Sequence, residues 1–579
     1  MAKLRDFVIA DGSGGLVTNK SDYEMARNEF KKTLNLDFDE RGKFKRRRGI
    51  QQWGDTKSGT IDESLFFSIS TLGDAPTSYH VMLDRASNAT LYRIVGDVVT
   101  AAIATSDTVI TFRSVAFFAA SGTVEINGDL IAYTGKAGAT LTGCTGILKA
   151  HAAGSIGNQI ISVGATGVDT RSGAYLSVLN NVLFINGRVG SATWDGSSIT
   201  AVSDADEPAG ICSTNYRDRI YVIGSGATDA SGTRNGSPLR VSFSDAGDAT
   251  SWDINNLFDV EDDLGESLRA LVEHEDILVL FKFNSIHTYD EVQLKQRIWN
   301  AGAYNQKVVK KINDVIYTFC PTGVYETNGF SARKISDPVK EYLKEFKPAI
   351  ETIGRAVTNT FAGVFEDKYL LYIGDITEPE VLTDVVLVFD TIRRNWTIYD
   401  GFTDFTHLGS LTGINQGDSG NYNIDQALFA GDSNGKYWRL FENRYLDFQS
   451  TRTYQGGDIV ANLISNSNGN ALSTVLETPY HTLGNLDWKE IEYLAAMVER
   501  GDFQISYSLD IGSKKTDWES LGDFRNSITF RRLKNNLKQG YRMAFRVTNQ
   551  TANTLSIFNG LVAGNIETME EKRYADFLK

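Results

Sequence analysis

The segment "RGKFKRRRG", residues 41–49, has the residue types best suited to chemistry on anions. Six of its nine residues are lysine or arginine. Such a cluster can serve as a targeting signal, bind the phosphates of nucleic acid, or pair with the carboxylates of another protein. Arginine favours the last of these, because its guanidinium group forms bidentate pairs with carboxylates. The candidate site residues are Lys43, Lys45, Arg46, Arg47 and Arg48.

Other residues with catalytic or metal-binding chemistry do not form complete motifs. His274-Glu275 resembles part of a zinc-binding HExxH motif, but Leu278 stands where the second histidine belongs. The acidic run Asp259–Glu266 does not follow the spacing of an EF-hand. "SFSDAGDATSW" (Ser242–Trp252) is similar to the Asp-box turn of sialidase propellers, which is structural. We therefore expect no catalytic residue, no cofactor site and no metal site.

The bulk composition favours a large β-protein. The 579 residues include 53 glycines and 8 prolines, which suits tight turns between strands. Lysine and arginine number 58 against 72 aspartates and glutamates, and the net charge of −14 argues against general nucleic-acid binding. We expect no disulfide framework from Cys144, Cys212 and Cys320, no secretory signal, and no membrane span.

One pattern recurs along most of the chain and predicts the fold. A polar turn with aspartate or asparagine precedes a run of apolar β-formers, as in "NNVLFING", "RDRIYVIG", "EDILVLF" and "NDVIYTF". About seven copies recur at intervals of roughly 30–50 residues, the range typical of propellers. Radial packing of such sheets buries both faces of each one. Two stacked β-sandwiches are the alternative.

The predicted fold is mainly β, with a β-propeller-like repeat core, an inserted small β-module and a C-terminal antiparallel β-sandwich-like domain. The alternating apolar residues of "FQISYSL" and "YRMAFRV" predict half-buried strands in that last domain. Helices are predicted near 338–353 and at 21–36, where Ser21 and Glu24 fit a capping box. The expected division is 1–60 (arm with the basic segment), 61–100 (first blade), 101–163 (inserted module), 164–460 (remaining blades) and 461–579 (C-terminal domain).

The N-terminal region resembles that of podovirus tail nozzle proteins, also called the tail tubular protein B family. The similarity rests on a Gly-Gly turn, spaced asparagines and a G-x-x-x-R-R-x-G motif: Gly14-Gly15, Asn28, Asn35, Gly42 and Arg47-Arg48-Gly49. The segments "NNVLFINGR", "SFSDAGDATSWD" and "FAGDSNGKYWRL" are similar to propeller segments of that family, and 101–163 to a small module of phage tail proteins.

This resemblance implies a structural subunit of a short phage tail. Several copies, six in related nozzles, would surround a channel that conducts genome DNA below the portal and adaptor, and would support tail fibres. The protein would then reside in the virion tail, and in the host cytoplasm during assembly. The basic segment would lie at a subunit or adaptor interface, with DNA contact or a solvated loop as alternatives. The competing functions are a glycan-binding or glycan-cleaving propeller and an intracellular scaffold.

Overall fold

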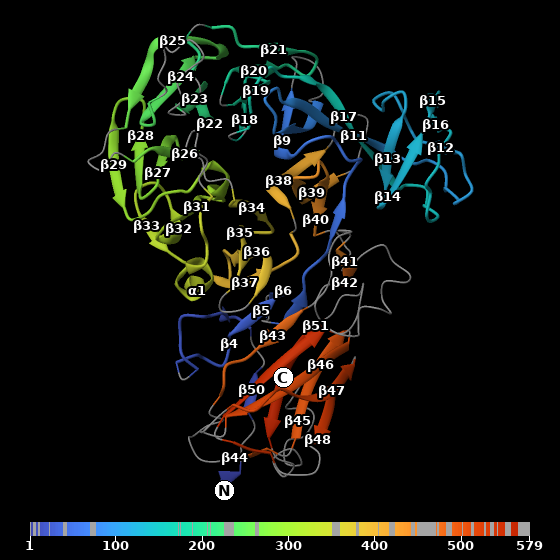
Figure 1. Cartoon of the computed structure of the whole chain (residues 1–579), viewed down its shortest axis with the longest axis vertical. Coiled ribbons are helices and arrows are strands. Elements are labelled where there is room, and N and C mark those ends of the chain that lie inside the picture. The colour runs from blue at the N-terminus through green and yellow to red at the C-terminus, as the bar shows by residue number, and fades with distance from the viewer. Residues whose placement is uncertain are drawn as a thin grey trace.

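The fold is almost entirely β-structure, arranged as a ring of sheets above an elongated β-domain, with a small module projecting beside the ring (Figure 1). The computed structural model describes residues 2–564 except 4–6, 10–11, 23, 39–42, 70–76, 172, 174, 188, 205, 209, 225–236, 261–265, 350–358, 378–380, 403, 416–422, 442–445, 448–469, 472–473, 482–488, 492, 501, 511–514, 526–527, 533–537, 541 and 550–556.

Seven four-stranded antiparallel units form the ring, which is a β-propeller. Blade 1 consists of β9 (Ile61–Ile69), β10 (Thr77–Asp84), β11 (Thr90–Val98) and β17 (Ile156–Ala165). Blade 2 comprises β18 (Tyr175–Leu179), β19 (Val182–Asn186), β20 (Ser191–Trp194) and β21 (Ile199–Ala201). Blade 3 comprises β22 (Gly210–Tyr216), β23 (Arg219–Gly224), β24 (Arg240–Asp245) and β25 (Asp248–Asp259). Blade 4 comprises β26 (Leu268–His274), β27 (Ile277–Lys282), β28 (Ser285–Tyr289) and β29 (Leu294–Trp299).

The remaining blades complete the circle. Blade 5 comprises β30 (Lys310–Ile312), β31 (Val315–Cys320), β32 (Gly323–Thr327) and β33 (Ala332–Lys334). Blade 6 comprises β34 (Phe361–Phe365), β35 (Lys368–Ile376), β36 (Leu382–Asp390) and β37 (Asn395–Tyr399). Blade 7 comprises β38 (Phe405–Asn415), β39 (Asn423–Asp432), β40 (Tyr437–Leu440) and β8 (Ile50–Gln52). The first strands of blades 7 and 1 contact each other, so the ring is closed.

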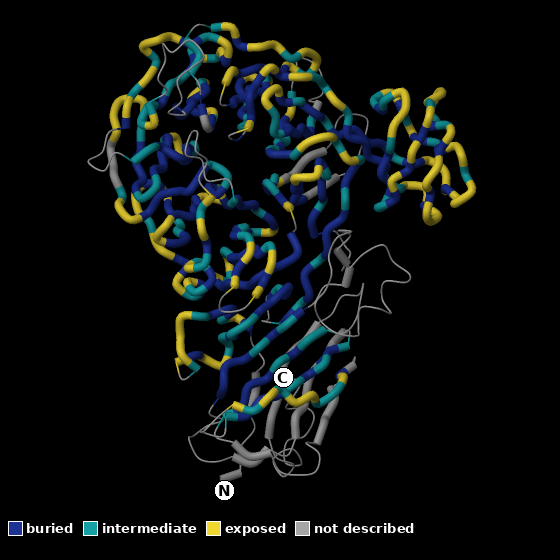
Figure 2. Tube along the Cα trace, viewed as in Figure 1, coloured by how far each residue is buried: buried dark blue, intermediate teal, exposed yellow. Residues whose placement is uncertain are grey.

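The repeated sequence pattern corresponds to the first hairpin of a blade. Asn180-Asn181, Arg217-Asp218, Glu275-Asp276 and Glu366-Asp367 all have positive φ at both positions. Two left-handed residues form the type I′ turn, whose twist matches that of the flanking strands. The apolar run that follows each turn is the second strand of its blade, and this strand is buried on both faces between neighbouring blades (Figure 2). The core is therefore a circle of buried interfaces between successive sheets.

The inserted module leaves blade 1 between β11 and β17. It contains β12 (Val109–Thr111), β13 (Gly122–Ile126), β14 (Asp129–Tyr133), β15 (Gly135–Ala137) and β16 (Thr140–Thr142) around its own apolar cluster. Strand β17, which the sequence prediction placed largely in the module, pairs with β11 along its length and with β13 at Gly157 and Asn158, so it is the outer strand of blade 1 and also joins that blade to the module.

The N-terminal arm joins the propeller to the C-terminal domain. Its strands are β1 (Ala2–Lys3), β2 (Phe7–Ile9), β3 (Gly15–Leu16), β4 (Glu29–Phe30), β5 (Lys32–Leu34), β6 (Leu36–Phe38) and β7 (Phe44–Arg46). The C-terminal domain contains β43 (Val475–Glu477), β44 (Lys489–Ile491), β45 (Tyr493–Arg500), β46 (Asp502–Asp510), β47 (Glu519–Arg525), β48 (Ile528–Arg532), β49 (Lys538–Gly540), β50 (Arg542–Asn549) and β51 (Ile557–Gly564). A short pair, β41 (Leu446–Asp447) and β42 (Asn470–Ala471), precedes it.

Arm strand β5 makes one continuous sheet of blade 6 and the C-terminal domain. It pairs with β37 on one side and β43 on the other, in the order β34-β35-β36-β37-β5-β43-β50-β46-β47. The predicted alternation in the C-terminal domain is confirmed, since Phe503, Ile505 and Leu509 on β46 and Phe545 and Val547 on β50 are buried. The two domains are therefore coupled through backbone hydrogen bonds.

The helix predicted at 21–36 is wrong. The backbone nitrogen and the hydroxyl of Ser21 both donate to Glu24 Oε2, but these bonds close a turn, and strands β4 and β5 follow it. Tertiary pairing with β37 and β43 outweighs the local helical pattern. Near 338–353 the helix is short: a 3₁₀ turn η2 (Asp337–Val339) leads into α1 (Lys340–Lys344), and residues 350–353 lie outside the described part of the chain.

Strand β8 closes the propeller, and we expect its buried side chain to be essential for stability. Ile50 is 1% exposed and packs among blade 6 and 7 residues. Ile50→Ala should lower the free energy of unfolding by about 2–4 kcal/mol, because a cavity remains at the seam. Urea unfolding followed by tryptophan fluorescence measures this. Ile392→Ala, at a 71% exposed position, is the control and should change stability by less than about 0.5 kcal/mol. Equal stability of both variants would contradict the closure role.

Candidate functional site

The basic segment lies at the joint between the two domains. Its first part, β7, sits in the C-terminal sheet between β6 and β51. Three residues later the chain enters blade 7 as β8, next to β40. Residues 47–49 are therefore the crossing from one domain to the other. Residues 41–42 lie outside the described residues.

Arg47 is the centre of a buried hydrogen-bond network at this crossing. Its side chain is 1% exposed, and its Nε donates to Asn35 Oδ1 at 2.8 Å. Its two terminal nitrogens donate to the carbonyl oxygens of Asp400 and Arg48, both at 2.9 Å. The guanidinium also lies over the rings of Tyr399 and Phe402, 5.7 and 5.3 Å from their centroids. One side chain thus connects the arm to the end of blade 6.

Asn35 supports Arg47 from the other side. Its backbone is left-handed, with φ of 54°, and the residue is fully buried. Its amide Nδ2 donates to Asp400 Oδ1 at 2.6 Å, while its Oδ1 accepts from both Arg47 and the Asp400 backbone nitrogen. Asparagine tolerates this conformation better than most residues with a side chain. We call Asn35, Arg47 and Asp400 the arm lock.

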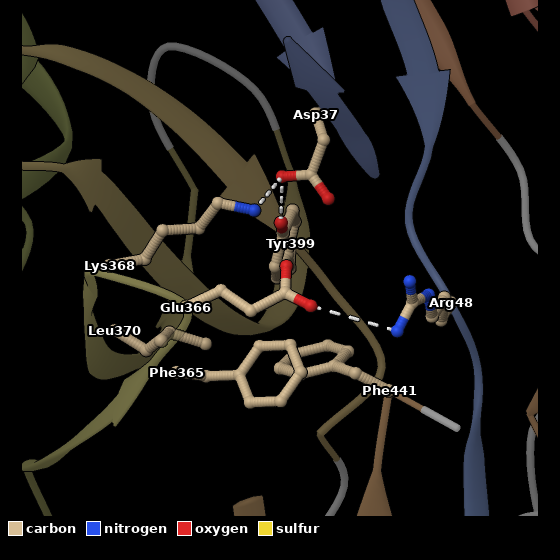
Figure 3. A pocket seen from close by; sticks show the side chains of 8 residues that line it. All are labelled: Asp37, Arg48, Phe365, Glu366, Lys368, Leu370, Tyr399 and Phe441. Carbon is tan, nitrogen blue, oxygen red and sulfur yellow. Dashed lines mark hydrogen bonds and ion pairs between the residues drawn. The ribbon is translucent and has the colours of Figure 1, made fainter. Parts of the chain in front are cut away.

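A small cavity of about 20 Å³ is lined by Arg48 and Tyr399, the sequence neighbours of Arg47 and Asp400, and Figure 3 shows the side chains around it. Lys368 Nζ donates to Asp37 Oδ1 at 2.9 Å, and the Tyr399 hydroxyl donates to the same oxygen. Arg48 reaches Glu366 at 3.6 Å, in a pair that is about half exposed. Burial raises the pKa of Tyr399 well above its usual value, with the Asp37 charge adding to the effect.

These positions correct part of the predicted interface. Arg46 and Arg47 are 2% and 1% exposed within a single chain, so in this conformation their side chains offer almost no surface to a partner or to DNA. Arg46 points inward because β7 alternates, with Phe44 and Arg46 buried and Lys45 partly exposed. The interface hypothesis is thereby limited to Lys43, Lys45 and Arg48, which are partly exposed.

The hub of the propeller is the second candidate site, because the blades of a propeller converge there. A 3₁₀ turn, η1 (Gln306–Val308), lies between blades 4 and 5 and is bound from several directions. Gln306 exchanges two hydrogen bonds with the backbone of Leu271 in blade 4, at 2.8 and 2.9 Å. Tyr369 of blade 6 donates to the Val308 carbonyl at 2.7 Å.

The side chain of Lys307, in η1, reaches blade 1, which is not adjacent to blade 4 or blade 5. Its Nζ lies 3.0 Å from Asp62 Oδ1 and 2.6 Å from the Asp62 carbonyl oxygen, in blade 1. Arg85 contacts the same carboxylate at 2.8 Å. Burial of Asp62 opposes ionisation, but the charges of Lys307 and Arg85 outweigh burial and lower its pKa. An ion pair therefore ties opposite sides of the ring together through the hub.

Two buried histidines lie at the seam between blades 7 and 1. His407 Nε2 is 2.9 Å from Ser64 Oγ, and His80 Nε2 is 2.7 Å from the Tyr437 hydroxyl. Burial lowers the pKa of His407 to about 3, and the nearby charge of Lys307 contributes. Burial also lowers the pKa of His80 well below its usual value. Both rings are therefore neutral at neutral pH.

The remaining sequence candidates have structural roles. His274 is buried at the end of β26, and Asp276 in the following turn forms a bidentate pair with Arg217 of blade 3, at 2.7 and 2.9 Å. Asp245 of the Asp-box-like segment accepts hydrogen bonds from Ser251 and Asn256 within the same hairpin. Of the acidic run, 261–265 lie outside the described residues. Within the part of the chain that is described, no group of His, Cys, Asp and Glu is arranged to hold a metal ion.

Sequence reasoning missed the partners that matter most. Asn35 was noted for its place in a motif, but nothing local pointed to Asp400, 365 residues away. Asp62 and Lys307 belong to no recurring pattern. The isolated basic cluster was a true signal of an arginine-dependent contact, but the contact lies within the chain.

Replacing Arg47 should destabilise the whole chain. In Arg47→Ala, Asn35 and the Asp400 carbonyl lose a buried charged donor, and we expect a loss of about 3 kcal/mol in the free energy of unfolding. Arg48→Ala is the matched control and should cost at most about 1 kcal/mol, because its ion pair is exposed. Urea denaturation of the full chain measures both. Similar values for the two variants would show that the arm lock does not hold the joint.

Acidification should open the ring seam. Unfolded histidine takes up a proton near pH 6.5, whereas folded His407 does so only near pH 3, so the unfolded chain binds more protons between these values. The stability due to neutral His407 is complete above about pH 6.5 and is lost as the pH falls toward 3, by at most about 1.4 kcal/mol per pH unit. His407→Gln should flatten the decline in melting temperature between pH 6.5 and 4. Ile392→Gln should keep the wild-type slope, and an unchanged slope in His407→Gln would refute the assignment.

The comparisons with known proteins give no family. No protein-family model matches the chain, and no curated protein sequence matches it. Among solved structures, BamB from Moraxella catarrhalis is similar over 59% of this chain and 99% of its own, with 10% identity and a TM-score of 0.28. An exo-beta-1,3-galactanase from Phanerochaete chrysosporium covers 90% of this chain and 99% of its own, with 9% identity and a TM-score of 0.24. At these scores neither protein bears on function. In the described residues, no helix has the length and hydropathy to cross a lipid bilayer.

Proposed function

We propose that this chain is a structural subunit of a short phage tail, in which several copies form a nozzle-like ring that conducts DNA. The observation that carries the proposal is the arm, whose strands belong to both domains. Strand β5 joins blade 6 to the C-terminal domain in one sheet, and β8 completes blade 7. The two domains of such a chain share one sheet, and this continuous backbone pairing suits the wall of a conduit.

The occupied centre of the propeller is an argument that the DNA channel would lie between several chains. Turn η1 and the Asp62–Lys307 pair occupy the centre of the propeller, so a DNA duplex does not fit along the axis of one chain. A channel would have to be enclosed by several copies arranged around a common axis. This agrees with the homo-oligomer, six copies in related nozzles, that the N-terminal resemblance implies.

The net charge of the chain supports the passage of DNA without binding to it. The chain has a formal charge of −14, and an acidic lining repels phosphate and limits adhesion of DNA during ejection. The partly exposed Lys43, Lys45 and Arg48 lie at the domain joint, where an adaptor could bind them. Tail fibres and the portal complex are the other partners that this function requires. The proposal includes no catalytic role.

The direct test is to remove this chain from the phage that encodes it. We expect particles with truncated tails that fail to eject DNA into cells, and recovery of infectivity when purified wild-type chain is added to those particles. Plaque titre and electron microscopy measure the two effects. Addition of Arg47→Ala should restore infectivity less well than Arg48→Ala, because only the former weakens the domain joint.

A glycan-binding or glycan-cleaving propeller predicts a different outcome. Particles without the chain would then have complete tails and would lose only adsorption to host cells. Complete tails together with normal DNA ejection, triggered chemically in the absence of the chain, would overturn the structural role.

A further inference from the structure

We infer that the inserted module of one chain binds the outer edge of blade 3 of the next chain, in a head-to-tail ring. This inference deepens the proposed function and rests on it. The two surfaces lie on opposite sides of the propeller, with the module at one side and β25 at the other (Figure 1). Both carry exposed residues (Figure 2). A heterologous contact joins two different surfaces of the same chain, and these two surfaces are far enough apart for each chain to bind two neighbours at once.

Blade 3 presents a rigid apolar protrusion. Ser242 of β24 pairs with Leu257 of β25, whereas Ser244 pairs with Trp252. Strand β25 therefore has extra residues between these two pairs, and they form a bulge. Ile254 on this bulge is 59% exposed. Hydrogen bonds hold the bulge in place: Asp253 Oδ1 accepts from the backbone and side chain of Asn255, at 2.8 and 3.0 Å. An apolar side chain held outward in this way loses little entropy on binding.

The module presents a second apolar protrusion. Leu148 is 65% exposed, and Leu130 on β14 is 40% exposed. Buried Asp129 fixes the loop, because its Oδ2 accepts from the backbone nitrogens of Leu148 and Lys149, at 2.9 and 3.0 Å. His151 Nε2 lies 3.0 Å from the same oxygen. The position of Leu148 is therefore set before any partner arrives.

Charge identifies the occupant as a second copy of this chain. On the module, the side chains of Lys149 and Arg113 are 47% and 43% exposed, whereas their carboxylate neighbours Asp129 and Asp97 are buried. On blade 3, β25 is acidic, with Asp248 and Asp253 both exposed. Pairing either surface with its own copy would bring like charges together, whereas pairing module with blade 3 brings opposite charges together. Head-to-tail contact is therefore favoured over a two-fold dimer.

Cysteine cross-linking of the full chain tests this arrangement. The natural cysteines are buried, so a short bismaleimide reports only on introduced thiols. We expect a covalent dimer when Leu148→Cys and Ile254→Cys chains are mixed, and none from either variant alone. Val381→Cys, at a 78% exposed position next to blade 6, is the control and should not cross-link with either. A dimer from one variant alone, or none from the mixture, would overturn the inference.

Sedimentation velocity gives a second, independent measure. Leu148→Asp and Ile254→Asp should each weaken self-association at least tenfold, while Val381→Asp should not change it. Lys149→Glu and Asp248→Lys should each weaken it, and the combination should recover at least half of the loss, since exchanging the two charges leaves opposite charges on the two surfaces. A monomeric wild-type chain, or full association of all variants, would refute the surface. The proposed tail function is tested separately, by the experiment on phage particles that lack the chain.

Discussion

Three residues of backbone, Ile50 to Gln52, join the N-terminal arm to the last blade by pairing with β40. Without this fourth strand, the backbone groups of Trp438–Leu440 that now pair with β8 would lose their partners in the sheet. The same crossing carries Arg47, whose guanidinium bonds to the arm and to blade 6 at once. Ring closure and the attachment of the C-terminal domain are therefore not separate events, since both depend on where this short piece of arm lies.

Buried cations and buried histidines are accommodated in opposite ways in this protein. In the arm lock and the hub, permanent cations are surrounded by carbonyl, amide and carboxylate oxygens, so their desolvation is offset by hydrogen bonds. At the seam between blades 7 and 1, histidines are kept neutral by burial. Cations that keep their charge thus lie at the domain joint and in the hub, whereas groups that gain a charge in acid lie where the ring closes.

Local sequence predicted the first hairpins of blades 2, 3, 4 and 6, because a polar turn precedes the second strand of each. Asn180-Asn181 and Glu275-Asp276 mark two of these hairpins with positive φ, a conformation that asparagine and aspartate adopt more readily than most other residues. Local sequence did not predict the contacts between distant segments. Nothing near residue 50 indicates β40, and nothing near 156 shows that the chain returns to blade 1 after the module. Arg47 looked like a surface charge because its partners are 12 and 353 residues away.

The place of β8 in blade 7 also sets the order in which the protein can be completed. The ribosome makes this strand among the first residues, yet its neighbour β40 emerges almost four hundred residues later. At about 5–20 residues per second, the arm waits for roughly 20 to 80 seconds before its partner exists. During that time its apolar strands must avoid other edges, including those of chains on neighbouring ribosomes. Blade 7 can therefore be completed only after the ribosome has made residues 437–440.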